Sequence, residues 1–344
     1  MISRKINEAA VAKAKKLIDR AERIVVVCHT SPDGDAIGSC LAAMHVFSSL
    51  GKDVKAVIPD QPLQNLRSLP GAKELVDASK YADFANKLIA EADLILCLDF
   101  NELSRTGRLK EVLANAKAPK IVVDHHLNPS IEAEVCISHP EMAATAYLLF
   151  RLLCRLELFN FIDRKAAECM LAGMMTDTGN FAYNCADPEL FTVTAELVKK
   201  GADKEKLYNI LFNTFTANCL RLNSYALLKK MEVFDDEGAA LITLSRDELN
   251  RFHYTKGDTE GLVNRPLAIP GIVYSCFMRQ ESDCIRVSMR SRGTFPVNKI
   301  CAEYFGGGGH LNAAGGEFHG TIEEAADLFR SLLSENKSRY IDKQ

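Results

Sequence analysis

Five short segments of the chain end in side chains that commonly bind metal ions. In chain order they are IVVVCHTSPDGD, LILCLD, IVVDHH, MMTDTG and GGGGH. Carboxylate oxygens mixed with imidazole nitrogens are typical ligands of divalent cations such as Mn²⁺ or Mg²⁺. There are too many ligands for one ion. They indicate two ions that share a bridging carboxylate, an arrangement that cleaves phosphate esters with an activated water.

The first segment carries His29, Asp33 and Asp35 just after an expected strand at 24–28. A proline and a glycine between these residues favour a tight turn, so the three side chains can converge. An aspartate in this place also commonly caps the following helix, and this alternative applies to Asp33 and Asp35.

The second and third segments supply the central ligands. Asp99 is the only carboxylate at the end of the expected strand 94–98, which makes it the predicted bridging ligand, although an aspartate here can also start a turn. In Asp124-His125-His126, neighbouring side chains at a strand end point to opposite sides. We therefore assign His125 to a metal and His126 to the substrate or to orienting a ligand. Asp124 is expected to hold an imidazole in place.

The last two segments lie further along the chain. Asp177 is the expected fourth carboxylate, with a helix N-cap as the alternative. A glycine run followed by His310 lets backbone N–H groups approach a phosphate. The glycines of this run are Gly306, Gly307, Gly308 and Gly309.

A basic strand precedes the glycine run. Arg286, Arg290 and Arg292 alternate along it and therefore share one face. Such a face is a candidate anion-binding wall opposite the metals, and a solvated surface is the alternative.

The amino-acid composition indicates which classes of protein the chain can belong to. The 344 residues are 47% hydrophobic and 25% charged, with a net charge of −3. This balance argues against tracking of long nucleic acids and for short ones held in a cleft. No apolar run approaches the roughly 20 residues that span a bilayer. Residues 1–24 form a charged amphipathic helix without the apolar core of a secretory signal, so we expect no membrane partner and a cytoplasmic location.

The pattern along the chain predicts an α/β fold. Apolar runs alternate with helical stretches up to residue 178, which favours a parallel sheet with its ligand site beyond the carboxyl ends of the strands. The expected strands are 24–28, 54–58, 94–98, 120–123 and 134–137, and the expected helices are 36–50, 83–92, 109–116 and 144–156.

A smaller α/β domain is expected after a helical connector. Its expected strands are 239–244, 271–278 and 284–291, and its expected helices are 245–252, 297–305 and 322–335. The resulting division is a catalytic domain at 1–207, a connector at 208–230 and a second domain at 231–344, with the active site expected in the cleft between domains.

The motifs HTSPDGD, DHH, TDTG and GGGGHLNAAG, together with Asp99, resemble those of the DHH phosphoesterase family with its DHH-associated C-terminal domain. Length and the GGGGH segment are most similar to its NrnA-type subgroup, which hydrolyses short oligoribonucleotides (nano-RNA) and removes the 3′-phosphate of 3′-phosphoadenosine 5′-phosphate. The resemblance implies two cations, Mn²⁺ by preference and Mg²⁺ or Co²⁺ as alternatives. One would be held by His29, Asp33 and Asp99, and the other by Asp35, Asp99, His125 and Asp177.

The same resemblance implies the roles of other residues. His126 would lie near the scissile phosphate, and the glycine run with His310 and Arg290 would bind the terminal phosphate and base of the substrate. Phe100-Asn101 departs from the Thr or Ser that follows this aspartate in many relatives, and Arg105 and Arg108 are expected to supply basic contacts there.

Other activities fit the same motifs. Hydrolysis of linear pApA or of cyclic di-AMP is one alternative, and a short-chain polyphosphatase is another. A nucleotide-sensing binding protein is a non-enzymatic alternative, but it predicts a missing ligand, and every ligand of the pattern is present. Homodimerisation is left open.

Overall fold

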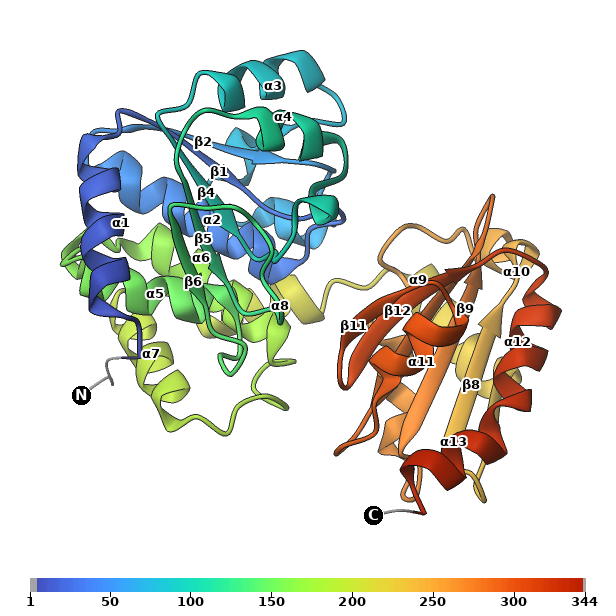
Figure 1. Ribbon diagram of the computed structural model, residues 1–344. Helices are drawn as coiled ribbons and strands as arrows, with labels where there is room; N and C mark the ends of the chain where they lie inside the picture. Colours follow the sequence, from blue (N-terminus) through green and yellow to red (C-terminus); the bar gives the residue numbers. More distant parts are fainter. Residues whose placement is uncertain (1–4, 343–344) are drawn as a thin grey trace. The chain divides into compact units, whose positions relative to one another are not determined.

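The computed structural model describes residues 5–342. The chain divides into two compact units, Met1–Thr214 and Phe215–Gln344, which are described separately below (Figure 1). None of the helices within 5–342 is long and apolar enough to cross a membrane.

The first unit is built on a six-stranded parallel sheet with the order β3-β2-β1-β4-β5-β6. The strand order reverses between β1 and β4, which are direct neighbours. Parallel sheets of this type bind ligands at such a reversal, beyond the carboxyl ends of the strands. The strands are β1 (Arg23–Val27), β2 (Asp53–Ile58), β3 (Val76–Asp77), β4 (Leu94–Leu98), β5 (Lys120–Asp124) and β6 (Val135–Ser138).

Helices cover both faces of this sheet (Figure 1). Alternate strand residues point to opposite faces, so Ile24 and Val26 join one apolar core, and Val25 and Val27 join the other. The first core is closed mainly by α2, α5 and α6, and the second by α3 and α4. The α-helices of this unit are α1 (Glu8–Arg20), α2 (Gly34–Ser49), α3 (Ala82–Ala90), α4 (Lys110–Asn115), α5 (Thr145–Arg155), α6 (Arg164–Asp177), α7 (Pro188–Lys199) and α8 (Lys204–Phe212).

Two glycines bring α2 and α6 into close contact. A Cβ at Gly38 would lie 2.4 Å from the carbonyl oxygen of Cys169, and a Cβ at Gly173 would lie 2.7 Å from Oδ1 of Asp35. Both distances are too short for any side chain. The backbones therefore approach closely, which seats the start of α2 against the end of α6.

The second unit contains a six-stranded sheet with the order β11-β12-β10-β9-β8-β7. All neighbouring pairs are antiparallel except β8 with β9. Helices α11 and α12 pack on one face, and α9 and α10 pack on the other. The strands are β7 (Met231–Phe234), β8 (Ala239–Leu244), β9 (Tyr274–Gln280), β10 (Ile285–Ser291), β11 (Gly308–His310) and β12 (Ala313–Phe318). The helices are α9 (Ala217–Tyr225), α10 (Arg246–Arg251), α11 (Val297–Tyr304), α12 (Ile322–Ser331) and α13 (Leu333–Tyr340).

The fold class is as predicted, but part of the glycine run forms a strand that the sequence did not predict. Gly308–His310 forms β11, paired with β12, and neither strand was predicted. Glycine and alanine have weak strand propensity, so an Ala-Ala-Gly-Gly strand gives little signal in the sequence. Within the expected connector 208–230, Leu211 of α8 packs in the core of the first unit and Leu222 of α9 packs in a core of the second.

Candidate metal centre

Asp99 lies at the centre of the candidate site, directly after β4. Its Oδ2 is 3.4 Å from Nε2 of His29, and its Oδ1 is 3.5 Å from Nε2 of His125. The side chain is almost fully buried, and the backbone has a φ of +67°. Such left-handed backbone at a non-glycine residue is strained and is often found at functional sites. One carboxylate thus presents a separate oxygen to each of two imidazoles, as the predicted bridging role requires.

Backbone carbonyls fix the orientation of both imidazoles. Nδ1 of His29 lies 2.8 Å from the carbonyl oxygen of Thr30, and Nδ1 of His125 lies 3.1 Å from that of Met142. A carbonyl can only accept, so each Nδ1 carries the hydrogen in these contacts. Each Nε2 therefore faces the carboxylates, which is the usual arrangement of metal-binding histidines.

Asp33 combines the two roles that the sequence left as alternatives. Its Oδ1 accepts the N–H groups of Asp35 and Ala36, both at 3.0 Å, and so caps α2. Its Oδ2 lies 3.9 Å from Nε2 of His29. Capping therefore occupies one oxygen, while the other faces the candidate metal position.

Asp35 is fully buried and joins α2 to the start of α5. Its two oxygens accept the backbone N–H groups of Thr145 at 2.5 Å and Ala146 at 2.9 Å. Oδ2 is also 4.0 Å from Nε2 of His125. Asp35 is therefore held by a helix N-terminus, where a negative charge is favoured, and still faces the cluster.

Asp177 is the last residue of α6, so it is not the N-cap that the sequence left open. Its Oδ2 lies 3.2 Å from Nε2 of His125, the shortest of the three carboxylate contacts to that nitrogen. The close contact between α2 and α6 brings Asp177 and Asp35 to the same histidine.

These side chains form two groups whose donor atoms all lie within 4.8 Å of one another. One group is His29, Asp33 and Asp99, and the other is Asp35, His125 and Asp177. Each combines hard oxygen donors with one imidazole and contains no thiolate, a donor set that fits Mn²⁺ or Mg²⁺. The residues present therefore fit two cations that share Asp99.

The cluster carries more carboxylates than nearby positive charges, and this alters its protonation. Burial raises the pKa of Asp177 to about 7, helped by the charges of Asp33 and Asp99 and opposed by the hydrogen bond with His125. Burial and neighbouring carboxylates likewise raise the pKa of Asp35. Without cations, the protein therefore retains protons in this cluster.

The pKa values of the two imidazoles are also raised, whereas that of Asp99 is lowered. Burial acts to lower the pKa of His29, but the hydrogen bond with Asp99 and the charge of Asp33 outweigh it and raise this pKa to about 10. The pKa of His125 is raised in the same way, with Asp177 as the main partner. Burial acts to raise the pKa of Asp99, yet the hydrogen bond and charge of His29 hold it well below its usual value.

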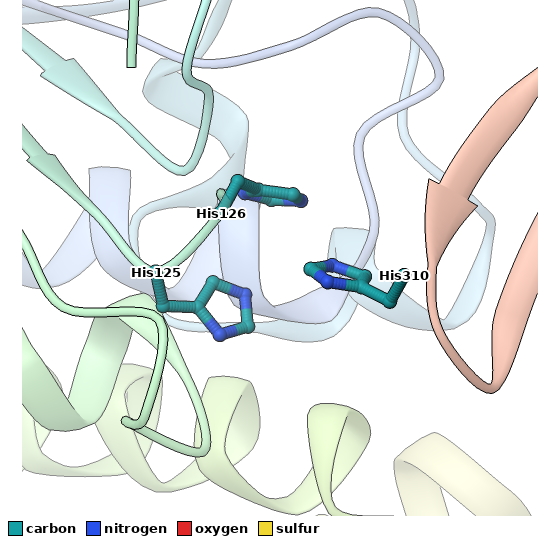
Figure 2. Close-up of side chains that lie close together, drawn as sticks. All are labelled: His125, His126 and His310. Carbon is teal, nitrogen blue, oxygen red and sulfur yellow. The ribbon is translucent and has the colours of Figure 1, made fainter. Parts of the chain in front are cut away.

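His126 and Asp124 form a pair at the edge of the cluster, and Nδ1 of His126 also lies 3.8 Å from Oδ1 of Asp99. Nδ1 of His126 lies 2.7 Å from Oδ1 of the fully buried Asp124, which is the contact expected of an aspartate that orients an imidazole. The rings of His125 and His126 meet edge to face, with centroids 4.9 Å apart and planes at 72° (Figure 2). The shortest carboxylate contact of His126 is therefore to Asp124, and that of His125 is to Asp177.

Thr145 belongs to the site but was not predicted. It is fully buried, and its hydroxyl donates to Oδ1 of Asp99 at 2.9 Å. A threonine before an apolar helix is common, so the sequence alone gave no signal for this role.

Arg105 lies next to the candidate site through its backbone. Its carbonyl accepts the N–H of Thr30 at 2.7 Å, which places the 3₁₀ segment Leu103–Leu109 beside the residue that follows His29. Among residues 5–342, the guanidinium of Arg105 has no hydrogen-bond or ion-pair partner. It is therefore available for an anion.

In the second unit, Arg290 and His310 share one face of the sheet. Arg290 is paired with Ala313 across β10 and β12, and Ala313 is paired with His310 across β12 and β11. Strands are about 4.8 Å apart, so the two side chains start about 10 Å from each other. Only Ala313 stands between them. Figure 2 shows His310 at the end of β11.

The other two arginines of the expected basic wall have different positions. Arg286 forms a 2.7 Å ion pair with Glu317, and Arg292 lies beyond the end of β10. The guanidinium of Arg290 donates to the carbonyl of its neighbour Met289 at 2.9 Å. Of these three arginines, Arg290 therefore remains the candidate for binding an anion on this face.

The four glycines before His310 differ in whether the structure would accept a side chain in their place. A Cβ at Gly307 would lie 1.9 Å from the carbonyl oxygen of Gly315, and one at Gly309 would lie 2.5 Å from that of Ala313. Gly306 has a φ of +54°. Only Gly308 would place a Cβ in open space without a left-handed backbone, so packing within the unit does not explain this glycine.

Comparisons with family models and known proteins identify the family of this chain. Residues 23–174 match the DHH family, N-terminal domain, and residues 240–336 match the DHHA1 domain. The bifunctional oligoribonuclease and PAP phosphatase NrnA of Thermus thermophilus is 32% identical over 92% of this chain and 90% of its own length. The chain belongs to the DHH family. NrnA of Bacillus subtilis, with the same description, is 26% identical over 92% of this chain and 96% of its own.

Solved structures extend the comparison. An exopolyphosphatase-related protein from Bacteroides fragilis has a TM-score of 0.96 and 44% identity, covering 98% of this chain and 99% of its own. An exonuclease RecJ bound to manganese has a TM-score of 0.51 and 16% identity over 99% of this chain and 97% of its own, which shows a shared fold.

Cyclic-di-AMP phosphodiesterases are also related to this DHH-family chain. GdpP of Geobacillus thermodenitrificans is 25% identical over 93% of this chain, which corresponds to 48% of GdpP. The chain therefore spans about half the length of that relative.

Proposed function

We propose that this protein is a metal-dependent phosphoesterase that hydrolyses short oligoribonucleotides to mononucleotides and 3′-phosphoadenosine 5′-phosphate to AMP. The observation that carries the proposal is the position of Asp99, whose two oxygens face Nε2 of His29 and Nε2 of His125 at 3.4 and 3.5 Å. The substrates are inferred from the NrnA relatives, which match over nearly the whole chain.

The proposed cofactor is a pair of divalent cations, with Mn²⁺ preferred over Mg²⁺ or Co²⁺. We assign one cation to His29, Asp33 and Asp99, and the other to Asp35, Asp99, His125 and Asp177. When bound, the cations supply an activated water and neutralise charge on the phosphoryl oxygens. The protein contributes fixed imidazole orientations and a buried carboxylate cluster that needs positive charge.

Residues around the cluster are assigned to the substrate. Asp124 holds Nδ1 of His126 at 2.7 Å, and we assign Nε2 of this histidine to the scissile phosphate. Arg105 is assigned to a second phosphate because its guanidinium has no partner among residues 5–342. In this way the protein orients the phosphate that is attacked.

The second unit is assigned to substrate binding. Arg290 and His310 share one sheet face, and Gly308 leaves an open backbone next to them. We propose that they bind the terminal phosphate and base. In domain terms, residues 1–207 are catalytic, 208–230 connect, and 231–344 bind substrate. We also propose that the enzyme acts in the cytoplasm, on nucleotides that form there.

A second candidate is the hydrolysis of pApA or cyclic di-AMP. It is favoured by the GdpP relative, whose match covers 93% of this chain. The same metal cluster would serve either reaction, so the two candidates differ only in substrate.

A hydrolysis assay with Mn²⁺ tests the proposal. The substrates are 3′-phosphoadenosine 5′-phosphate, pApA, a pentaribonucleotide, a long RNA, cyclic di-AMP and pyrophosphate. We expect mononucleotides from the short RNAs, phosphate from the first compound, and an intact long RNA. Cleavage of the di-adenylates alone would favour the second candidate, and inactivity with metal bound would overturn the substrate assignment.

A further inference from the structure

A partly exposed aromatic patch lies on the first unit, outside the metal centre. It consists of Phe181, Phe191, Lys204, Tyr208 and Phe212. The ring centroids of Phe181 and Phe191 are 5.7 Å apart, and those of Tyr208 and Phe212 are 5.5 Å apart. Nζ of Lys204 is 5.9 Å from the ring of Phe181 and 5.8 Å from that of Tyr208, so one lysine joins the two pairs. Phe191 is 48% exposed and Tyr208 is 36% exposed, whereas Phe181 and Phe212 are partly buried against the core of the unit.

Helix spacing and the loop after α6 position the patch. Lys204, Tyr208 and Phe212 recur every four residues and therefore share one face of α8. The loop after α6 has left-handed backbone at Gly179, Asn180 and Phe181. Asn180 accepts a 2.9 Å hydrogen bond from Nζ of Lys204, which ties this loop to α8.

The patch is close to the metal centre. Phe181 follows Asp177 by four residues. Four residues span at most about 14 Å even when fully extended, so a short oligonucleotide with its phosphate at Asp177 can reach the aromatic rings. The patch belongs to the segment between the two matched domains, 23–174 and 240–336, so the family matches do not account for it.

The chemistry of the patch favours nucleobases over a protein partner. Aromatic faces combined with a cation form the usual stacking platform for single-stranded nucleic acid, because every base offers a π-face. Lysine is depleted from protein–protein interfaces, yet here it lies at the centre of the patch. A second copy of this chain is therefore the less suitable occupant.

We propose that the aromatic patch stacks the bases of a short single-stranded oligonucleotide whose scissile phosphate lies at the metal centre. This inference rests on the proposed function and adds a binding site that favours short oligonucleotides over single nucleotides. It predicts that 3′-phosphoadenosine 5′-phosphate, which has one base, does not need the patch.

The test compares the wild type with the double variant Phe191→Ala/Tyr208→Ala. Base stacking on an aromatic ring contributes enough that the KM for a pentaribonucleotide is expected to rise about tenfold or more. Hydrolysis of 3′-phosphoadenosine 5′-phosphate is expected to stay unchanged. Phe84→Ala is the matched control, because Phe84 is a 51% exposed phenylalanine on α3. An unchanged KM for the pentaribonucleotide, or an equal loss on both substrates, would overturn the proposal.

A binding measurement separates this proposal from the proposed function. Fluorescence anisotropy with a labelled pentaribonucleotide is carried out in an Asp99→Asn background, with and without the double substitution. Weaker binding after the double substitution supports the patch even if the wild type hydrolyses neither substrate. Equal binding of the pentaribonucleotide with and without the double substitution would refute the proposal. A dimer that forms without the double substitution and is lost with it would also refute the proposal, because a second copy of the chain would then occupy the patch.

Discussion

The hydroxyl of Thr145 donates a 2.9 Å hydrogen bond to Oδ1 of Asp99, the oxygen that also faces His125. The backbone N–H of the same threonine binds Asp35 at 2.5 Å. The start of α5 therefore holds two carboxylates of the cluster at once. This relationship makes Thr145 a positioning residue for the proposed metal centre.

Thr145→Val keeps the shape of the side chain but removes the donor to Asp99. Loss of a hydrogen-bond partner behind a metal ligand typically lowers affinity or activity about 10–100-fold. We expect a loss in this range in both Mn²⁺ affinity and kcat, measured by calorimetry and by the hydrolysis assay. Thr145→Ser keeps the hydroxyl and should retain most of both. Equal behaviour of the two variants would contradict the positioning role.

Asp99→Asn should abolish turnover and leave the fold intact. Asparagine tolerates the left-handed backbone at φ +67°, so this substitution adds little strain. It removes the charge that the two cations are proposed to share, and we expect kcat to fall by more than about 100-fold, beyond the cost of losing an outer partner. Thermal unfolding provides the control for folding. Near-normal activity would exclude Asp99 as the bridging ligand.

Cation binding should strengthen as the pH rises. The raised pKa values of about 10 for His29 and about 7 for Asp177 mean that, in the metal-free protein at neutral pH, His29 is protonated and Asp177 is protonated in about half of the molecules. A cation must displace these protons, so protons and metal compete. We expect the apparent Mn²⁺ affinity to rise by about tenfold per pH unit for each proton displaced, between about pH 5.5 and 8.

Calorimetry in two buffers with different ionisation enthalpies checks this prediction, because released protons add the buffer's heat to the signal. The Asp177→Asn variant is the control and should release fewer protons near neutral pH. An affinity that is independent of pH would contradict the protonation described for the cluster.

Gly308→Ala and Gly307→Ala should have different effects. A Cβ at Gly307 would lie 1.9 Å from the carbonyl oxygen of Gly315, so this variant should unfold at a clearly lower temperature. A Cβ at Gly308 meets no atom within 4 Å, so this variant should fold normally. If Gly308 approaches the substrate, Gly308→Ala should raise KM severalfold with little change in Tm. Unchanged kinetics in this variant would remove Gly308 from the binding site.

Local patterns in the sequence predicted the parallel strands and the aspartates and histidines at their ends. Continuous apolar runs such as Leu94–Leu98 are typical of strands buried on both faces, and polar residues directly after them must lie at one edge of the sheet. For this reason, five candidate ligands from three segments could be named before their contacts were known: His29, Asp33, Asp35, Asp99 and His125. Asp177, at the end of α6, was named instead as the fourth carboxylate that two cations need.

Long-range packing decided the rest, because it depends on contacts that no local pattern encodes. The placement of β1 beside β4 brings His29 to Asp99, and the glycine contact between α2 and α6 brings Asp35 and Asp177 to the same histidine. The carbonyls that orient the imidazoles and the hydroxyl of Thr145 come from distant or generic positions. The sequence alone determined which ligand types this protein has, whereas only the tertiary structure decided which oxygen faces which nitrogen.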